Sequence, residues 1–258
     1  MTNEPQFSLI VPTYNERAGL ERLVSSAHAV LSAHHIDAEL VVVDDNSPDG
    51  TGDLAEQLAA RFPMQVVHRE RKLGLGSAVM AGFARARGET LGVMDADFSH
   101  PPSALPNLLA AMRALDVEMV VGSRYITGGG SSHWPWPRRL LSRAGSLLAR
   151  PLTPVRDSGS GLFIVRRRAV EGVRVSAPGF KIGLELFCRG RIESVAEVPF
   201  VFTDRAAGQS KMSLREGLRY LGQLLELYAL RLKTRGGAPA RYRQATVEDM
   251  RRWGAVRE

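Results

Sequence analysis

The chain has a single cysteine, Cys188, among its 258 residues. One thiol cannot form an internal disulfide, so the sequence excludes a disulfide-stabilised secreted fold and fits a reducing compartment. Long hydrophobic runs are also missing, because no segment approaches the roughly 20 apolar residues that a membrane-spanning helix needs. Residues 1–6 are polar and the next apolar run covers only residues 7–11, so we expect no secretory signal peptide. We therefore expect a cytoplasmic protein whose contact with any membrane is peripheral.

Aromatic residues are few, at 7%, while hydrophobic residues make up 44% and charged residues 24% of the chain. These values are ordinary for a globular protein, so composition excludes neither an enzyme nor a binding module. The formal net charge is +7, and from Arg231 onward there are eight basic side chains against three acidic ones. The basic excess is therefore local, and we predict a basic C-terminal tail over residues 233–258. Such an end can serve nucleic acid, an anionic membrane surface or a phosphorylated ligand, or it can be a solvated tail.

Short apolar runs rich in β-branched residues alternate along the chain with segments of helical periodicity. This alternation predicts an α/β fold with a mostly parallel central sheet covered by helices. The predicted strands cover residues 7–11, 40–43, 65–68, 90–94, 119–122, 162–165 and 198–202. The last strong helix covers residues 213–232 and carries one apolar stripe, which is typical of an amphipathic helix. We predict a single domain over residues 1–232 that includes this helix.

A segment rich in Gly, Ser, Trp and Pro, residues 128–137, interrupts this pattern and is predicted to be an irregular loop. Within it, Trp134 and Trp136 are followed by two arginines, Arg138 and Arg139. Two interpretations remain open for the tryptophans. They are either core aromatics or part of a loop that meets lipid headgroups or covers a site.

Two carboxylates, Asp95 and Asp97, stand at the end of the apolar run 91–94. A strand that ends in two acidic residues separated by a small one presents hard oxygen ligands, suited to Mg²⁺ or Mn²⁺ carrying a diphosphate. Acidic residues are also common in turns, so the pair by itself is weak evidence. His100 follows closely, but the two prolines after it favour a turn residue over a metal ligand.

Other chemistry-bearing side chains follow two further predicted strands. Pro12, Tyr14 and Glu16 come after the first strand, and Asp45 closes the second. Because ligands in an open α/β sheet collect at the carboxyl ends of the strands, we expect these side chains to lie near the acidic pair. An aromatic ring can stack on a nucleobase, and a carboxylate can accept hydrogen bonds from base or ribose groups. Together with the acidic pair, this set predicts a pocket for a nucleotide diphosphate.

A series of motifs follows in order along the chain. The motifs are Val11-Pro12-Thr13-Tyr14-Asn15-Glu16, residues 44–51, Lys72-Leu73-Gly74-Leu75-Gly76-Ser77-Ala78, residues 95–102, Gly122-Ser123-Arg124-Tyr125, Ser158-Gly159-Ser160-Gly161, residues 179–186, and Arg205-Ala206-Ala207-Gly208-Gln209-Ser210-Lys211. Each is common by itself, whereas the ordered set is highly specific. In this order they resemble the family 2 glycosyltransferases of the GT-A (Rossmann-like) fold, of the dolichol-phosphate or polyprenyl-phosphate mannose synthase type. The resemblance runs from Ser8 to about Leu232, nearly the whole chain.

The resemblance implies a GDP-mannose donor, a polyprenyl (dolichyl-type) phosphate acceptor and a divalent metal, Mg²⁺ or Mn²⁺. The nucleotide-sugar site that it implies comprises Pro12, Tyr14, Glu16, Asp45, Asp95, Ala96, Asp97, Arg124, Arg205 and Lys211. Within this set, Asp97, Arg124 and Arg205 would be catalytic. The arginines, together with Lys211, would neutralise phosphates, a task for which a guanidinium fork is well shaped.

The metal ligands that the resemblance implies are Asp95 and Asp97, with Ser99 as a third, weaker candidate. Ser99 stands where other members of the family have Gln. The serine side chain is shorter, so water would intervene between Ser99 and the metal.

The mechanism implied by the resemblance is an in-line displacement of GDP by an acceptor phosphate oxygen, with inversion at the anomeric carbon. A phosphate monoester has a second pKa near 6. It is already an anion at neutral pH, so this acceptor needs no carboxylate base. The reaction would take place on the cytoplasmic face of the membrane, with the protein bound peripherally or through a separate membrane protein.

Three alternatives stay open. A related transferase could move glucose, N-acetylglucosamine or a deoxyaminosugar to the same kind of acceptor. A non-catalytic nucleotide-sugar-binding protein could recruit a membrane partner. The intact acidic and basic motif residues argue against this non-catalytic alternative. A nucleic-acid-binding protein could use the basic end, and its binding would fall steeply with salt; we expect no nucleic acid partner.

Overall fold

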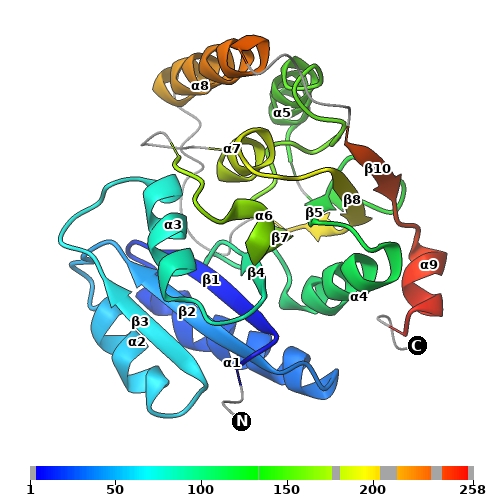
Figure 1. Ribbon diagram of the computed structural model, residues 1–258. Helices are drawn as coiled ribbons and strands as arrows, with labels where there is room; N and C mark the ends of the chain where they lie inside the picture. The colour runs from blue at the N-terminus through cyan, green and yellow to red at the C-terminus, as the bar shows by residue number, and fades with distance from the viewer. Residues whose placement is uncertain (1–3, 133, 176–180, 204–213, 234–239, 255–258) are drawn as a thin grey trace.

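The computed structural model describes residues 4–132, 134–175, 181–203, 214–233 and 240–254 (Figure 1). Its central feature is an eight-stranded sheet with the order β10-β8-β5-β7-β4-β1-β2-β3. The strands are β1 (Phe7–Thr13), β2 (Ala38–Asp44), β3 (Met64–His68), β4 (Thr90–Val93), β5 (Met119–Ser123), β7 (Phe163–Arg166), β8 (Ser194–Pro199) and β10 (Arg241–Gln244). Neighbouring strands in this sheet are parallel except where β7 pairs antiparallel with both β4 and β5. The mostly parallel α/β sheet predicted from the sequence is confirmed.

The central strands are apolar without interruption because both faces of the sheet are covered. Residues such as Leu9, Ile10 and Val11 of β1 point alternately to opposite faces, and all three are fully buried. In register, Leu9 pairs with Leu40 of β2, so the two strands end side by side. The turns that follow β1, β2 and β4 therefore meet at one edge of the sheet, where ligands of open α/β folds bind.

Helices cover both faces of the sheet (Figure 1). One face packs against α1 (Arg17–Ala33), α2 (Thr51–Ala59), α4 (Leu105–Leu115) and α9 (Val247–Arg252). The other face packs against α3 (Leu75–Arg85), α6 (Arg167–Val170) and α7 (Ile182–Arg189). A short 3₁₀ turn, η1 (Pro102–Ala104), leads into α4. Each helix contributes an apolar stripe, as in a surface helix of a globular protein.

Two further helices, α5 (Trp136–Leu148) and α8 (Leu214–Lys233), lie beyond α7 and form an outer layer (Figure 1). A separate small core joins them to α7 through Ala149, Leu152, Leu184, Leu224 and Leu227. Hydroxyl groups of α8 fasten the pair, since the Tyr220 hydroxyl donates to the Gly145 carbonyl at 2.8 Å and the Tyr228 hydroxyl to the Leu148 carbonyl at 2.5 Å. The amphipathic helix predicted over 213–232 is therefore present, and it packs mainly on other helices rather than on the sheet.

The C-terminal region differs from the basic tail predicted over residues 233–258. Residues 241–244 form β10, which extends the sheet by pairing in parallel with β8, and α9 follows. A capping box starts α9, in which Thr246 and Asp249 each accept a hydrogen bond from the other's backbone N–H. The strand escaped prediction because Arg241-Tyr242-Arg243-Gln244 is polar, as suits a strand at the edge of a sheet.

The region around residues 128–137 is more regular than the predicted loop. A two-residue strand, β6 (Gly130–Ser131), pairs in parallel with β9 (Val201–Phe202), and α5 begins at Trp136. The predicted strand 198–202 is thereby divided between β8, which begins at Ser194, and β9. The two tryptophans differ in burial: Trp134 is buried in the core, whereas Trp136 is 74% exposed.

Candidate active site

The antiparallel strand β7 determines which segments meet at the ligand-binding edge of the sheet. Phe163, at the start of β7, pairs with Val93 of β4 and with Val121 of β5. The loop before β7, residues 157–161, therefore lies beside the residues that follow β4 and β5. Those residues include the acidic pair after β4 and Arg124 after β5.

The acidic pair forms a cluster with His100. One ligand atom each from Asp95, Asp97 and His100 lies within 4.8 Å of the others, and no other such group of three or more appears among the described residues. His100 Nδ1 lies 3.6 Å from Asp95 Oδ2. Burial lowers the pKa of His100, against the raising influence of Asp95 and Asp97, which favours the neutral imidazole that metals bind. The donor set of two carboxylates and one imidazole therefore fits a divalent metal ion.

His100 lies in the bend after β4, in line with the turn that the sequence favoured, but its side chain also lies within reach of the acidic pair, and ligation of a metal by His100 stays a prediction. Its side chain is only 2% exposed and lies between the rings of Phe200 and Phe202, with centroid distances of 5.4 and 5.5 Å. The prolines after His100 concern the backbone, and the direction of the imidazole follows from its contacts with the two phenylalanine rings. A surface turn residue would instead face the solvent.

Ser99 supports Asp97. Its backbone N–H and its hydroxyl both donate to Asp97 Oδ1, at 3.0 and 2.5 Å. These two bonds fix the position of one carboxylate oxygen of Asp97. The described contacts thus give Ser99 an orienting task, and direct ligation of a metal by Ser99 stays a prediction.

Gly161 allows the loop before β7 to approach the cluster. A Cβ atom added to this residue would lie 2.6 Å from Asp95 Oδ2 and 3.2 Å from the His100 ring. Both distances are shorter than a comfortable contact, so a larger residue would push the carboxylate out of place. Glycine at this position keeps the loop 157–161 tightly against the acidic cluster.

The predicted nucleoside end of the site lies after β1 and β2. The Tyr14 ring is 36% exposed, and the Lys72 ammonium lies 3.8 Å from its centroid. Asp45 is buried and accepts a hydrogen bond from Arg69 at 2.6 Å. Burial raises the pKa of Asp45, while the Arg69 charge opposes that rise. An exposed ring beside a charged pair is a suitable surface for a nucleobase.

Strand pairing, burial and a backbone hydrogen bond locate the other predicted nucleotide-binding residues, Pro12, Ala96 and Glu16. Pro12 lies in β1 opposite Val43, and Ala96 is buried between the two carboxylates of the acidic pair. The Glu16 backbone N–H donates to the Thr51 hydroxyl at 3.0 Å, which joins the turn after β1 to the start of α2. These residues share the edge of the sheet with the acidic cluster, but their contacts with a nucleotide stay predictions.

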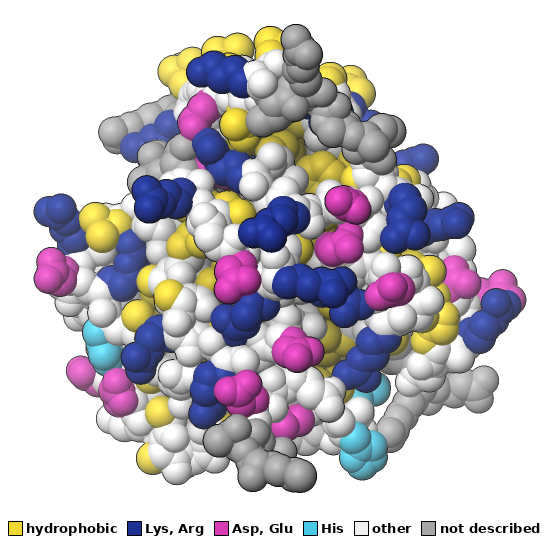
Figure 2. All heavy atoms as spheres, viewed as in Figure 1, with side chains coloured by type: hydrophobic (Ala, Val, Ile, Leu, Met, Phe, Trp, Pro, Cys, Tyr) yellow, Lys and Arg dark blue, Asp and Glu magenta, His cyan; other side chains and the backbone are white. Residues whose placement is uncertain are grey.

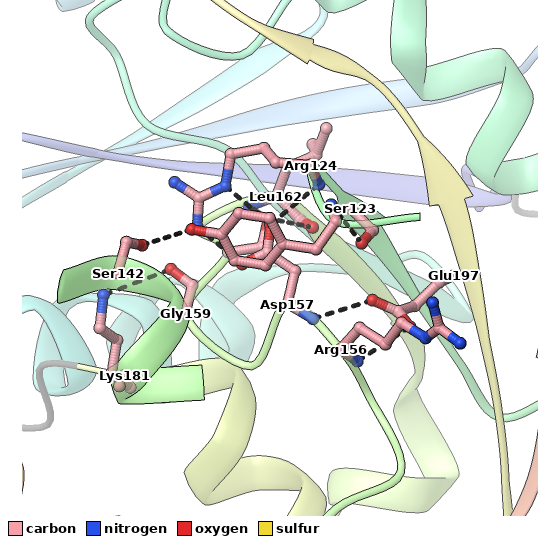
Figure 3. A network of polar contacts seen from close by, with 12 residues as sticks. Ser123, Arg124, Ser142, Arg156, Asp157, Gly159, Leu162, Lys181 and Glu197 are labelled. Carbon is pink, nitrogen blue, oxygen red and sulfur yellow. Dashed lines mark hydrogen bonds and ion pairs between the residues drawn. The ribbon is translucent and has the colours of Figure 1, made fainter. Parts of the chain in front are cut away.

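Arg124 forms a buried ion pair with Asp157 (Figure 3). Its Nε donates to Asp157 Oδ2 at 2.7 Å, its terminal nitrogen to Oδ1 at 2.6 Å, and its backbone N–H to Oδ2 at 2.9 Å. Burial opposes the charge, but Asp157 outweighs it, so the pKa of Arg124 is raised. The guanidinium also lies 5.1 Å from the ring centroid of Trp134, which is buried in the apolar core.

Asp157 is in turn held by Glu197 of β8 (Figure 3). Glu197 is fully buried and accepts hydrogen bonds from the backbone N–H groups of Arg156 and Asp157, each at 2.9 Å. The hydroxyl of Tyr242 in β10 donates to the same carboxylate. A chain of contacts therefore runs from the edge strand β10 to the guanidinium of Arg124.

Lys181 lies on the other side of the same loop. Its ammonium donates to the Gly159 carbonyl at 3.3 Å (Figure 3). Burial, and then the nearby Arg124 charge, lower the pKa of Lys181 to about 8. The remaining cations named by the sequence analysis, Arg205 and Lys211, lie outside the described residues.

Sequence reasoning missed four residues of this site: Asp157, Lys181, Glu197 and Arg69. Two of them had a signal in the chain, because Asp157 directly precedes the Ser158-Gly159-Ser160-Gly161 motif and Lys181 lies within the motif at residues 179–186. Their closeness to Arg124 depends on the direction of β7, which no local pattern encodes.

The chain matches one protein family and several individual relatives. The profile of the family described as Glycosyl transferase family 2 matches residues 8–174. A dolichol-phosphate mannosyltransferase from Pyrococcus furiosus is 40% identical over 224 residues, covering 85% of this chain but only 63% of that protein, so the chain spans less than two thirds of this relative. The dolichol-phosphate mannosyltransferase of Saccharomyces cerevisiae is 36% identical over 237 residues, covering 88% of both chains. The polyprenol monophosphomannose synthase of Mycolicibacterium smegmatis is 42% identical over 217 residues, covering 80% of both.

Solved structures agree on the fold. Glucosyl-3-phosphoglycerate synthase from Mycobacterium tuberculosis, in complex with Mn²⁺, UDP and glucosyl-3-phosphoglycerate, matches with a TM-score of 0.63 and 24% identity, covering 88% of this chain and 80% of that one. A mannosyltransferase from Pyrobaculum calidifontis in complex with GDP-Man and Mn²⁺ matches with a TM-score of 0.59 and 21% identity, covering 92% and 67%. At these identities the likeness concerns the fold alone. The family profile and the curated relatives go further, and by them the chain belongs to glycosyl transferase family 2.

Proposed function

We propose that this protein transfers mannose from GDP-mannose to a polyprenyl phosphate. The observation that carries the proposal is the pairing of two sites across the loop 157–161: the Asp95, Asp97 and His100 cluster on one side, and Arg124 with Lys181 on the other. A metal-ligating cluster suits the diphosphate of a nucleotide sugar, and a cationic cluster suits a second phosphate. The relatives named as mannosyltransferases and monophosphomannose synthases support mannose and a lipid phosphate as the two substrates.

The reaction is a displacement at the anomeric carbon of mannose. An oxygen of the acceptor phosphate forms the new bond to this carbon, while the bond to the β-phosphate oxygen breaks and GDP leaves with the electron pair. Mg²⁺ or Mn²⁺, held by Asp95, Asp97 and His100, would supply charge neutralisation for the leaving diphosphate. Ser99 orients Asp97, Tyr14 stacks on the base, and Arg124 holds phosphate oxygen within the site. The acceptor phosphate is an anion at neutral pH, so no side chain has to remove a proton.

The direct test uses radiolabelled GDP-mannose and a short polyprenyl phosphate, with and without Mg²⁺ or Mn²⁺. We expect metal-dependent passage of label into the organic phase. The matched control is the dephosphorylated polyprenol, which should accept no label. Binding of GDP-mannose without transfer would contradict the assignment of polyprenyl phosphate as the acceptor. Transfer from UDP-glucose or another nucleotide sugar in preference to GDP-mannose would contradict the assignment of the donor.

Tyr14→Ala should weaken GDP binding by about 1 to 3 kcal/mol, because stacking of an aromatic ring on a base contributes about that much. Isothermal titration with GDP gives the affinity directly. Tyr14→Phe keeps the ring and should bind GDP nearly as tightly as the natural protein. Equal affinities for all three proteins would remove Tyr14 from the nucleoside site.

We also propose that the protein docks on the cytoplasmic face of a membrane through its outer helices, α5 and α8. Among the residues that the structure describes, no helix has the length and apolar character needed to cross a bilayer. The two helices instead expose leucines to solvent: Leu140, Leu141, Leu147 and Leu148 of α5, and Leu218, Leu221, Leu225 and Leu232 of α8. Hydrophobic side chains with Lys and Arg beside them gather over α8 at the top of Figure 2. An apolar face with basic flanks suits an anionic lipid surface.

Replacing Leu141 and Leu225 together by serine should reduce binding to anionic vesicles by roughly a hundredfold, since each buried leucine contributes about 1.5 kcal/mol or more. Sedimentation with vesicles that contain phosphatidylglycerol measures the bound fraction. Val247→Thr, at an exposed position of α9, is the matched control. Vesicle binding that is unchanged in the double variant would place the membrane contact elsewhere.

A further inference from the structure

Glu197 of β8 is a carboxylate buried completely inside the protein. Its two oxygens accept hydrogen bonds from consecutive backbone N–H groups, those of Arg156 and Asp157, each at 2.9 Å (Figure 3). Both donors are neutral amides, and a buried carboxylate costs desolvation free energy that an apolar side chain of similar size would avoid. Packing of the sheet alone therefore gives no reason for a carboxylate at this position. The feature that it fixes is the backbone of residues 156–157.

Tyr242 contacts the same carboxylate from the edge of the sheet. In the pairing of β8 with β10, Gln244 lies opposite Glu197, so Tyr242, two residues earlier, lies on the same face of the sheet as Glu197. Its hydroxyl donates to the Glu197 oxygen that also accepts from Arg156. Burial, and then the hydrogen bond to Glu197, raise the pKa of Tyr242. The phenol therefore keeps its proton at neutral pH and remains a donor to the carboxylate.

Asp157 links these contacts to Arg124. Its backbone is held by Glu197, while its side chain accepts hydrogen bonds from the backbone N–H, the Nε and a terminal nitrogen of Arg124, at 2.6 to 2.9 Å. The Arg124 and Asp157 side chains are 7% and 0% exposed, so neither can turn to solvent. A carboxylate that pairs with a guanidinium through both oxygens fixes the direction of that guanidinium. Displacement of residues 156–157 would therefore displace the guanidinium as well.

The loop that begins at Asp157 also lies against the acidic cluster. Within the loop, the Ser160 backbone N–H donates to the Asp157 carbonyl at 3.1 Å, which closes a turn. A Cβ atom on Gly161, the next residue, would lie only 2.6 Å from Asp95 Oδ2. The backbone that Glu197 holds is thus joined to Arg124 directly and to the acidic cluster through this turn. Both sides of the proposed site depend on one anchored segment.

We propose that Glu197 and Tyr242 are positioning residues for the transfer reaction: they hold Asp157, and through it the Arg124 guanidinium, in the orientation that the reaction requires. This inference rests on the proposed function, which gives Arg124 its task. It adds two residues that lie beyond the part of the chain matched by the family profile, residues 8–174. Both act through Asp157 and Arg124 rather than on a substrate.

Tyr242→Phe removes the hydroxyl and keeps the ring. We expect kcat for mannose transfer to a short polyprenyl phosphate to fall by about tenfold, the scale of one lost hydrogen bond to a charged group, with the KM of either substrate changed by less than about twofold. A loss confined to kcat indicates an orientation that is needed only in the transition state. Glu197→Gln replaces an acceptor oxygen by an amide and should lower kcat by about a hundredfold, because misplacement of a reacting group by about 1 Å has that effect.

Glu118→Gln is the matched control. Glu118 also accepts from a backbone N–H and a hydroxyl, both of Ser194 at the start of β8. It precedes β5, however, whereas Arg124 follows β5, so the two lie at opposite ends of this strand. Glu118→Gln should therefore leave kcat unchanged. An unchanged kcat in Tyr242→Phe would overturn the inference, and so would an equal fall of kcat in Glu118→Gln.

A double variant tests whether Tyr242 acts through Arg124. Arg124→Lys keeps a positive charge but lacks the planar fork that matches Asp157. In this background Tyr242→Phe should change kcat by less than about twofold, because a residue that acts through the fork has no effect without it. A further fall of about tenfold, as in the natural background, would show that the two residues act independently and would overturn the inference.

A measurement without turnover follows the guanidinium itself. In protein that carries isotope-labelled arginine, NMR measures how fast the Arg124 Nε–H exchanges with water, and the resonance is identified by its absence from Arg124→Lys. This N–H donates to Asp157 at 2.7 Å, so its exchange should be slow in the natural protein and about tenfold faster in Tyr242→Phe. Equal exchange rates in the two proteins would overturn the inference.

Failure of this inference and failure of the proposed function give different results. If the natural protein transfers no mannose to any polyprenyl phosphate, the proposed function fails before any variant is made. If the natural protein transfers mannose, and Tyr242→Phe alters neither kcat nor the exchange of the Arg124 Nε–H, only the positioning role of Glu197 and Tyr242 fails.

Discussion

Asp97→Asn is expected to lower kcat for mannose transfer by roughly a thousandfold, the scale on which loss of charge stabilisation at a reacting centre acts. Asparagine has nearly the same shape as aspartate but removes one negative charge from the three-residue cluster. The amide also disturbs the bonds from Ser99, which both end on one oxygen of Asp97. Mn²⁺ binding, followed by electron paramagnetic resonance, should weaken in parallel with kcat.

Two further variants test whether the loss of activity is specific to the charge of Asp97. Asp116→Asn changes an exposed carboxylate at the C-terminal end of α4 and should leave kcat unchanged, since asparagine tolerates the left-handed backbone found there. Ser99→Ala keeps the charge of Asp97 and removes only the orienting hydroxyl, so kcat should fall by about tenfold. Full activity of Asp97→Asn with normal Mn²⁺ affinity would contradict the assignment of Asp95, Asp97 and His100 as a metal site.

Asp157→Asn is expected to lower the free energy of unfolding by about 3 to 5 kcal/mol, because it leaves the buried guanidinium of Arg124 without a matching charge. Both side chains of this pair are almost fully buried, at 7% and 0% exposed. Transfer activity should be lost at the same time, since Arg124 loses the contacts that fix its direction. Urea unfolding followed by circular dichroism measures the stability.

A second substitution separates stability from catalysis. Adding Arg124→Met to Asp157→Asn removes the uncompensated charge, so the double variant should recover much of the lost stability. It should stay inactive, because the guanidinium is gone. The control is Glu21→Gln, which breaks an ion pair with Arg61 whose side chains are 54% and 60% exposed, and which should cost less than about 1 kcal/mol. If Asp157→Asn also lowered the free energy of unfolding by less than about 1 kcal/mol, the stabilising role of the buried Arg124–Asp157 pair would be contradicted.

The sequence predicts the strands of the sheet well where they are buried. Runs such as residues 7–11 and 40–43 are apolar throughout because helices cover both faces, and that composition is visible without a structure. The edge strand β10 carries no such pattern, since one side of it has no neighbour and its residues are polar. The two-residue strands β6 and β9 are too short to show any period.

The residues of the candidate site also fall into a part that the sequence predicts and a part that it does not. Asp95, Asp97, Tyr14 and Asp45 follow strand ends directly, so the chain order places them at one edge of the sheet. Asp157 and Lys181 reach that edge only because β7 runs against its neighbours and returns the loop before it to the same place. For His100 the sequence favoured a turn over a metal ligand, because its neighbouring prolines describe the backbone and say nothing of where the imidazole points.

The contact from Tyr242 to Glu197 also bears on how the protein can be shortened. A chain cut after α8 would retain every motif of the family but would lose β10 and α9. The edge of β8 would then be open to pairing with other molecules, and Glu197 would lose a hydroxyl donor behind the Arg124 pair. A shortened chain should therefore keep residues 241–252, because the last strand is part of the sheet behind the Arg124 pair even though it lies outside every motif named above.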